Sequence, residues 1–228
     1  PATATRVFLA PLDDHTSVAA LLNEGDAEYY YFGDADGVFY FQTTNDAPLK
    51  RVIAVDVSDP TPDQWREVLP ESEATLNGAL LKGDYIVADY LENAHNVLKV
   101  YRTDGSFVRD VPLQGLGTVG MMSNHKKGSD FYFNYYSYLQ PFAVMHYDVE
   151  NDTLATFAEA ATIPNFEVDQ YETKQVFYES KDGTRVSMFI TARKGLVLNG
   201  SNPTILYGYG GFNVSVTPTY YAWLPAWL

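Results

Sequence analysis

The stretch Val38-Phe39-Tyr40-Phe41-Gln42 is a run of aliphatic and aromatic residues, a composition that favours a β-strand. Similar runs recur at residues 85–89 (YIVAD) and 131–135 (FYFNY). The first residues of the three runs lie 47 and 46 positions apart. A fixed period of this length predicts three copies of one structural unit.

Each of these runs has strand-like neighbours on both sides in the sequence. A following run occurs at 52–57, 98–101 and 143–149, and its first residues lie 46 and 45 positions apart. A preceding run can be placed at 28–32, 76–81 and 117–122, and a last run at 65–69, 106–111 and 153–157. Turn sequences such as Asp36-Gly37 and Asp104-Gly105 separate them. Four strands in every ~45 residues are typical of a β-propeller blade.

The number of repeats indicates that the chain is part of a longer protein. A β-sandwich with an accidental period is the alternative, but the spacings of the central and following runs agree within two residues. A closed propeller needs about 4 to 8 blades, and three blades would leave two unpaired sheet edges. We therefore expect further blades before Pro1 and interpret the 228 residues as a segment of a longer protein.

The repeat pattern stops near residue 165, where we place a domain boundary. Two strands are predicted beyond it, at 173–179 and 184–191, joined by the turn Ser180-Lys181-Asp182-Gly183. A short strand of buried character is predicted at 203–207, and it runs directly into Gly208-Tyr209-Gly210-Gly211-Phe212. The sequence thus predicts a mostly β chain with a separate segment after the repeats.

The glycine-rich turn is the strongest candidate for a functional site, because glycines allow a ligand to approach the backbone closely. Taken alone, it could equally be a tight turn packed by aromatic side chains. It lacks the lysine of a phosphate-binding loop and the third glycine of a dinucleotide fingerprint. In α/β-hydrolases, a glycine-rich loop after an early strand supplies one donor to the oxyanion hole, before the nucleophile in the chain.

The segment Ile205-Leu206-Tyr207-Gly208-Tyr209-Gly210-Gly211-Phe212-Asn213-Val214-Ser215 resembles the prolyl oligopeptidase family of serine peptidases. The stretch FYESKDGT at 177–184 is similar to that family as well, as are TNDAP at 44–48, NVL at 96–98 and SYLQP at 137–141. The resemblance covers essentially the whole chain in the right order. One departure is Ser187, where the family leads us to expect a proline.

This resemblance implies a seven-bladed β-propeller followed by an α/β-hydrolase domain, with residues 1–165 forming about three blades and residues 166–228 the first strands of the hydrolase domain. It also implies a Ser-Asp-His triad and cleavage of short peptides after proline. No G-x-S-x-G sequence occurs in the chain, and all four histidines, the last of which is His146, precede the hydrolase segment. We therefore expect the triad to lie outside these residues and the segment alone to be inactive.

The resemblance implies functional roles for two residues of the glycine-rich turn. Tyr209 matches the family tyrosine whose phenol donates to the oxyanion, and a phenol stays protonated at neutral pH. Phe212 matches a residue that lines the pocket for the substrate proline, where a flat ring suits a pyrrolidine. The alternatives are a core tyrosine bonded to backbone and an ordinary core phenylalanine. Tyr207 should point away from the site, because alternate strand residues face opposite sides.

The composition of the chain excludes several classes of binding partner. Fifteen basic against 29 acidic residues give a net charge of −14, which repels nucleic acid and anionic membranes. No apolar run approaches the roughly 18 residues of a membrane span, so we expect a soluble cytoplasmic or periplasmic protein. The absence of cysteine excludes disulfides and zinc–thiolate sites. The resemblance implies no metal or other cofactor, and short proline-containing peptides as partners of an enzyme that is monomeric when intact.

Two other functions stay open at this point. Propellers carry many unrelated activities, so a non-catalytic binding module would explain the repeats equally well. A related oligopeptidase of different specificity, such as one that cleaves at dibasic sites, would keep the chemistry and change the substrate. The turn from Gly208 to Phe212 on a non-repeat segment favours a peptidase over a binding module.

Overall fold

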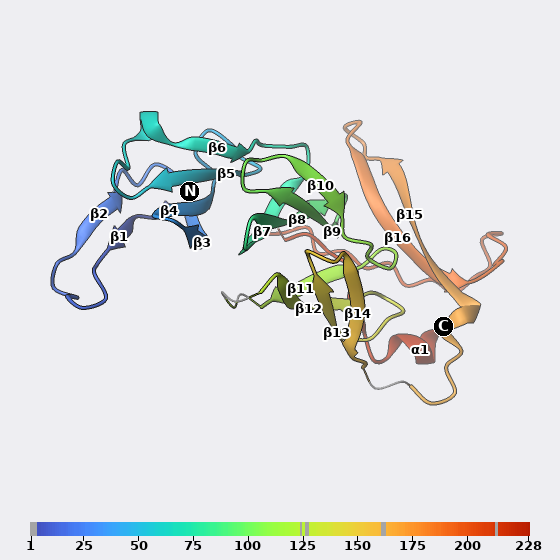
Figure 1. Cartoon of the computed structure of the whole chain (residues 1–228). Helices are drawn as coiled ribbons and strands as arrows, with labels where there is room; N and C mark the ends of the chain where they lie inside the picture. Colours follow the sequence, from blue (N-terminus) through green and yellow to red (C-terminus); the bar gives the residue numbers. More distant parts are fainter. Residues whose placement is uncertain (1–3, 124, 126–127, 161–162, 213) are drawn as a thin grey trace. The chain divides into compact units, whose positions relative to one another are not determined.

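The computed structural model describes residues 4–123, 125, 128–160, 163–212 and 214–228 (Figure 1). Its regular elements in these ranges are β-strands, apart from two short 3₁₀ helices, Pro62–Gln64 and Val168–Gln170, and the single turn of α1 (Leu224–Trp227). Within the described residues, no helix is long and apolar enough to cross a membrane. The prediction of a mostly β chain is confirmed.

Three four-stranded antiparallel sheets account for most of the strands. In each sheet the strands are adjacent in sequence order, so that each sheet is a meander. The first contains β3 (Tyr29–Ala35), β4 (Val38–Thr43), β5 (Arg51–Asp56) and β6 (Arg66–Leu69). The second contains β7 (Thr75–Lys82), β8 (Tyr85–Glu92), β9 (His95–Arg102) and β10 (Phe107–Asp110). The third contains β11 (Thr118–Met122), β12 (Asp130–Tyr136), β13 (Ala143–Asp148) and β14 (Thr153–Ala158).

These sheets have the form of propeller blades, and every strand expected from the repeat is present. Two further two-stranded sheets flank them in the sequence. The hairpin of β15 (Tyr171–Glu179) and β16 (Arg185–Arg193) was expected from the sequence, with its turn at Ser180 to Gly183. The pair β1 (Val7–Leu9) and β2 (Ala19–Leu22) was not expected, because both strands are short and carry little alternation.

By the density of backbone contacts the chain divides into two compact units. The first consists of Pro1–Leu91, Leu98–Val111 and Asn124–Ser129, and the second of Glu92–Val97, Pro112–Ser123 and Asp130–Leu228. The first unit holds the β3–β6 sheet, and the second holds the β11–β14 sheet and the β15–β16 hairpin.

The core of the first unit explains the aromatic-rich repeat. Successive residues of β5 point to opposite faces of the sheet, and both faces are buried. Val52 and Ala54 pack with Leu76 of β7 and with β8, while Ile53 and Val55 pack with residues of β2. A strand that is buried on both faces needs an apolar residue at every position, which the sequence VIAV at 52–55 supplies.

Tight turns connect the strands at defined places. The β3–β4 turn consists of Asp36 and Gly37, with φ of +50° and +81°, and the β8–β9 turn consists of Asn93 and Ala94, with φ of +47° and +67°. Two-residue turns with positive φ at both positions match the right-handed twist of the flanking strands. Ala94 is an unusual residue for this conformation, because its Cβ is strained there.

In the second unit, side chains tie the segments together over long stretches of sequence. The Tyr135 hydroxyl of β12 donates to the Gln114 carbonyl at 2.8 Å, and burial raises the pKa of this tyrosine to about 12. Gln175 of β15 and Ser187 of β16 both donate to the carbonyl of Asn93. Ser187, the departure from the family pattern, thereby makes a contact that a proline side chain could not make.

Candidate functional site

The glycine-rich turn lies in an extended segment without regular secondary structure. The segment between β16 and α1 contains no strand among its described residues, and Ile205, Leu206 and Tyr207 are 51%, 84% and 64% exposed. The prediction of a buried strand at 203–207 is therefore wrong for this structure. A strand forms only when a neighbour pairs with its backbone, and in the described part of the chain no other strand pairs with these residues.

The backbone of the turn is open on the side where side chains would project. A Cβ added to Gly208 or Gly210 would meet no atom within 4 Å, and Gly210 has a φ of +67° that suits glycine. Phe212 also has a positive φ, +53°, which is uncommon for an aromatic residue. The turn thus combines free space beside its backbone with a left-handed conformation at two of its residues.

Both residues predicted for the site are exposed. Tyr209 is 55% exposed and Phe212 is 92% exposed. The Tyr209 ring lies beside Gly211, because a Cβ added to that glycine would be 3.7 Å from Tyr209 Cε1. Within the described residues the Tyr209 hydroxyl has no hydrogen-bond partner and the two rings make no contact with each other. Asn213, the next residue of the motif, lies outside the described residues.

The segment after the turn is anchored at one point. The Thr118 hydroxyl on β11 donates a 2.8 Å hydrogen bond to the Pro218 carbonyl, and both residues are buried. Beyond it, the rings of Tyr221 and Trp223 stack with centroids 5.7 Å apart at the start of α1. Along the chain, the turn therefore lies between the β15–β16 hairpin and Pro218, the residue that is bonded to the third sheet.

The four histidines lie in different surroundings. His15 is exposed. His146 on β13 makes a 3.0 Å hydrogen bond with Asp130, and the centroid of its ring lies 4.7 Å from that of its cross-strand neighbour Tyr132, with the two planes tilted by 37°. His95 is half-buried, and burial lowers its pKa. The fourth, His125, is exposed and contacts Lys82 of β7, whose ammonium donates to its carbonyl at 2.6 Å.

No group of three or more His, Cys, Asp or Glu side chains that could hold an ion occurs within the described ranges.

Known proteins resemble this chain over most of its length. A prolyl endopeptidase of Elizabethkingia meningoseptica is 34% identical over 188 residues, which are 82% of this chain and 26% of the relative. A prolyl endopeptidase of Dictyostelium discoideum is 31% identical over 215 residues, 89% of this chain and 28% of the relative. The chain thus spans about a quarter of the length of these curated relatives.

Solved structures give the same result. A structure from a study of two prolyl endopeptidases superposes with a TM-score of 0.86 at 30% identity, covering 99% of this chain and 33% of that one. Prolyl oligopeptidase B from Galerina marginata superposes with a TM-score of 0.84 at 27% identity, covering 100% of this chain and 33% of that one.

The family whose model matches is described as "Prolyl oligopeptidase, N-terminal beta-propeller domain", and the match covers residues 2–160. The matched range includes all three four-stranded sheets and ends just after β14. On this match, and on the relatives that share most of its length, the chain belongs to the prolyl oligopeptidase family and contains part of its N-terminal β-propeller domain.

Proposed function

We propose that this chain is part of a serine-type endopeptidase that cleaves short peptides on the carboxyl side of proline. The observation that carries the proposal is the exposed phenol of Tyr209 in an open glycine-rich turn, in a chain of the prolyl oligopeptidase family. The named relatives are prolyl endopeptidases, and the solved structures include a member bound to peptide substrates. Since this chain covers only about a quarter of its relatives, the activity is proposed for the whole protein.

The proposal includes a division of the chain at about residue 165. Residues 1–165 supply about three blades of a seven-bladed propeller, and residues 166–228 supply the start of an α/β-hydrolase domain. The end of the repeat at β14 supports this division, as does the different topology of the β15–β16 hairpin that follows. The triad of serine, aspartate and histidine then lies outside the 228 residues, and the segment alone has no activity.

In this mechanism the serine attacks the carbonyl carbon of the substrate proline while the histidine of the triad takes the proton of the serine hydroxyl, and a tetrahedral intermediate forms. The Tyr209 phenol and a backbone N–H beside the serine donate hydrogen bonds to the developing oxyanion. Collapse of the intermediate breaks the C–N bond, the histidine gives its proton to the leaving amine, and water then hydrolyses the acyl-enzyme that remains. The flat ring of Phe212 packs on the pyrrolidine of the substrate. The propeller limits access to short peptides, which selects substrates by size.

Labelling of the full-length protein with a fluorophosphonate, followed by intact mass analysis, tests the proposal. One covalent label per chain is expected, together with cleavage of a blocked Gly-Pro substrate but not of its Gly-Ala counterpart. The isolated 228-residue segment serves as the control and should take up no label. If the full-length protein takes up no label, the proposed peptidase activity is wrong. If it is labelled but prefers dibasic sites, only the proposed specificity for proline is wrong.

A further inference from the structure

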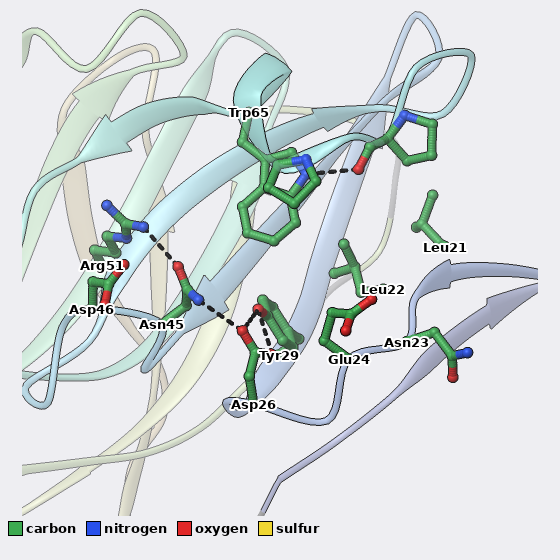
Figure 2. A pocket seen from close by; sticks show the side chains of 12 residues that line it. Leu21, Leu22, Asn23, Glu24, Asp26, Tyr29, Asn45, Asp46, Arg51 and Trp65 are labelled. Atoms are coloured by element: carbon green, nitrogen blue, oxygen red, sulfur yellow. Dashed lines mark hydrogen bonds between the residues drawn. The ribbon is translucent and has the colours of Figure 1, made fainter.

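The first unit contains a cavity of about 310 Å³ that the peptidase proposal does not use. Its wall combines two aromatic rings, Tyr29 and Trp65, with the buried aliphatic side chains of Leu21 and Leu22. Its remaining lining is largely polar and includes three carboxylates (Figure 2). All of these residues belong to the first unit.

The aromatic wall is held in one orientation. The rings of Tyr29 and Trp65 meet edge to face, with centroids 5.9 Å apart and planes at 79°. The Trp65 Nε1 donates to the Pro60 carbonyl at 2.9 Å, and the Tyr29 hydroxyl donates to Asp26 at 3.0 Å. Because both polar atoms of these rings are already bonded, a ligand meets mainly their π faces and edges.

One cation of the cavity wall is already committed to other groups. Arg51 donates to Asn45 Oδ1 at 2.9 Å through Nη2 and to Glu67 Oε2 at 3.0 Å through Nη1. Asn45 in turn donates a 3.0 Å hydrogen bond to Asp26. Together with the bond from Tyr29 to Asp26, this gives the chain of dashed hydrogen bonds from Arg51 to Tyr29 in Figure 2. The Nε of Arg51 is enclosed by protein and cannot reach a ligand.

Two carboxylates of the cavity remain exposed and without a hydrogen-bond or ion-pair partner in the described part of the chain: those of Glu24 and Asp46. A second cation lies nearby, since the Arg6 Nε donates to the Asn23 carbonyl at 3.0 Å, but Arg6 does not line the cavity. The lining therefore holds three carboxylates against one guanidinium that is engaged elsewhere. The chain as a whole carries −14.

We propose that this cavity binds the arginine side chain of a peptide. A guanidinium is planar, is weakly hydrated and stacks on aromatic faces, while its N–H groups match carboxylate oxygens. The methylene stem of an arginine suits the apolar part of the wall formed by Leu21, Leu22 and the aromatic rings. The negative lining complements the positive charge of this side chain and disfavours an anionic ligand. The site is separate from Tyr209 and does not depend on peptidase activity.

Isothermal titration with the blocked tripeptide acetyl-Gly-Arg-Gly-amide tests the proposal on the full-length protein. The matched probe replaces arginine by citrulline, which has nearly the same shape and no charge. We expect the citrulline peptide to bind about 10-fold more weakly, because the cation–π and carboxylate contacts are lost together. Equal affinities for the two peptides, or no detectable binding of either, would overturn the proposal.

Two exposed substitutions locate the site without disturbing the core. Glu24→Gln and Asp46→Asn should each weaken binding of the arginine peptide by about 2- to 5-fold, the range for exposed ion pairs. Glu73→Gln is the control, because Glu73 is an exposed carboxylate outside the cavity. Affinity that is unchanged in both cavity variants would place the peptide elsewhere and overturn the assignment. Fluorophosphonate labelling of the same variants should stay at the parent level, so that the two proposals fail separately.

Discussion

The hydroxyl of Thr118 donates a 2.8 Å hydrogen bond to the carbonyl of Pro218, a residue one hundred positions further along the chain. Both residues are buried, so neither group can exchange this bond for one to water. This contact joins the first strand of the third sheet to the segment that follows the glycine-rich turn. Its loss would leave a buried carbonyl unsatisfied, which costs more than a bond at the surface.

Thr118→Val should therefore lower the free energy of unfolding by about 1–3 kcal/mol, since valine has the shape of threonine without its hydroxyl. Thermal unfolding, monitored by circular dichroism, measures the change. Thr103→Val is the matched control, because no described residue bonds the Thr103 hydroxyl. Equal melting temperatures for the two variants would show that the Thr118 bond contributes nothing.

Gly105→Ala should destabilise the first unit strongly. An added Cβ would lie 2.2 Å from the Val68 carbonyl oxygen, and the φ of +92° disfavours any other residue. Gly37→Ala separates the two effects, because Gly37 has a φ of +81° and an added Cβ there would meet nothing within 4 Å. We expect a cost of about 1–2 kcal/mol at Gly37 from the backbone alone and a larger cost at Gly105. Urea unfolding of both variants measures the difference, and equal costs would contradict the clash.

His95 should make stability depend on pH in the acidic range. Burial lowers the pKa of this histidine in the folded protein, so the unfolded chain binds its proton more readily. Stability from this group is complete above the unfolded pKa of about 6.5 and is lost as the pH falls through the lower folded pKa. Urea midpoints between pH 7.5 and 5 should fall less steeply in His95→Gln than in the parent. The exposed His15→Gln should follow the parent, and identical slopes in all three proteins would rule out the effect.

Tyr209→Phe should lower kcat of the full-length enzyme by about 10²–10³-fold, the usual loss for one oxyanion donor. KM should change little, because the donor acts mainly on the charge that develops in the transition state. Tyr207→Phe is the control, since this residue lies two positions away in the same exposed segment. A kcat of Tyr209→Phe within a few-fold of the parent would remove Tyr209 from the mechanism.

Phe212→Ala should lower kcat/KM for proline substrates by about 10-fold, because the flat contact to the pyrrolidine ring is lost. Phe212→Tyr keeps an aromatic ring at the same position and should retain most of the activity. Steady-state kinetics with a Gly-Pro substrate distinguishes the two variants. If both lose activity equally, a position-specific role of the ring in binding proline is not supported.

Much of the fold could be predicted from the sequence because the repeat is carried by local pattern. The strands of the three blades each combine apolar residues with a turn sequence such as Asp36-Gly37, and both signals act within a few residues. The strands of the pair β1 and β2 are apolar too, but they have only three and four residues and no tight turn joins them. The segment at 203–207 has the composition of a strand, but pairing depends on a neighbour that composition does not reveal.

The two candidate sites differ in how far each could be predicted from the sequence. The glycine-rich turn is contiguous, so Tyr209 and Phe212 could be selected from sequence and then placed by the structure on an open, exposed segment. The arginine-binding cavity is assembled from residues far apart in sequence, such as Glu24, Asp46 and Trp65. No spacing or motif connects them. Only the packing of β2 beside the β3–β6 sheet brings them together.

The double-sided burial of β5 has a consequence for how the chain avoids misfolding. In a sheet with one solvent-exposed face, a shift of the strand register by one residue turns the apolar side chains toward water, which strongly disfavours the shifted pairing. In β5, where Val52 to Val55 are all buried, such a slip would exchange one apolar set for another at little cost. The register of β5 then depends on the turns that connect it to β4, where the left-handed residues Asp46 and Lys50, with φ of +48° and +73°, help to fix which positions can face each other. Mutations that relax these turns should produce misaligned and aggregating chains even where the native core is untouched.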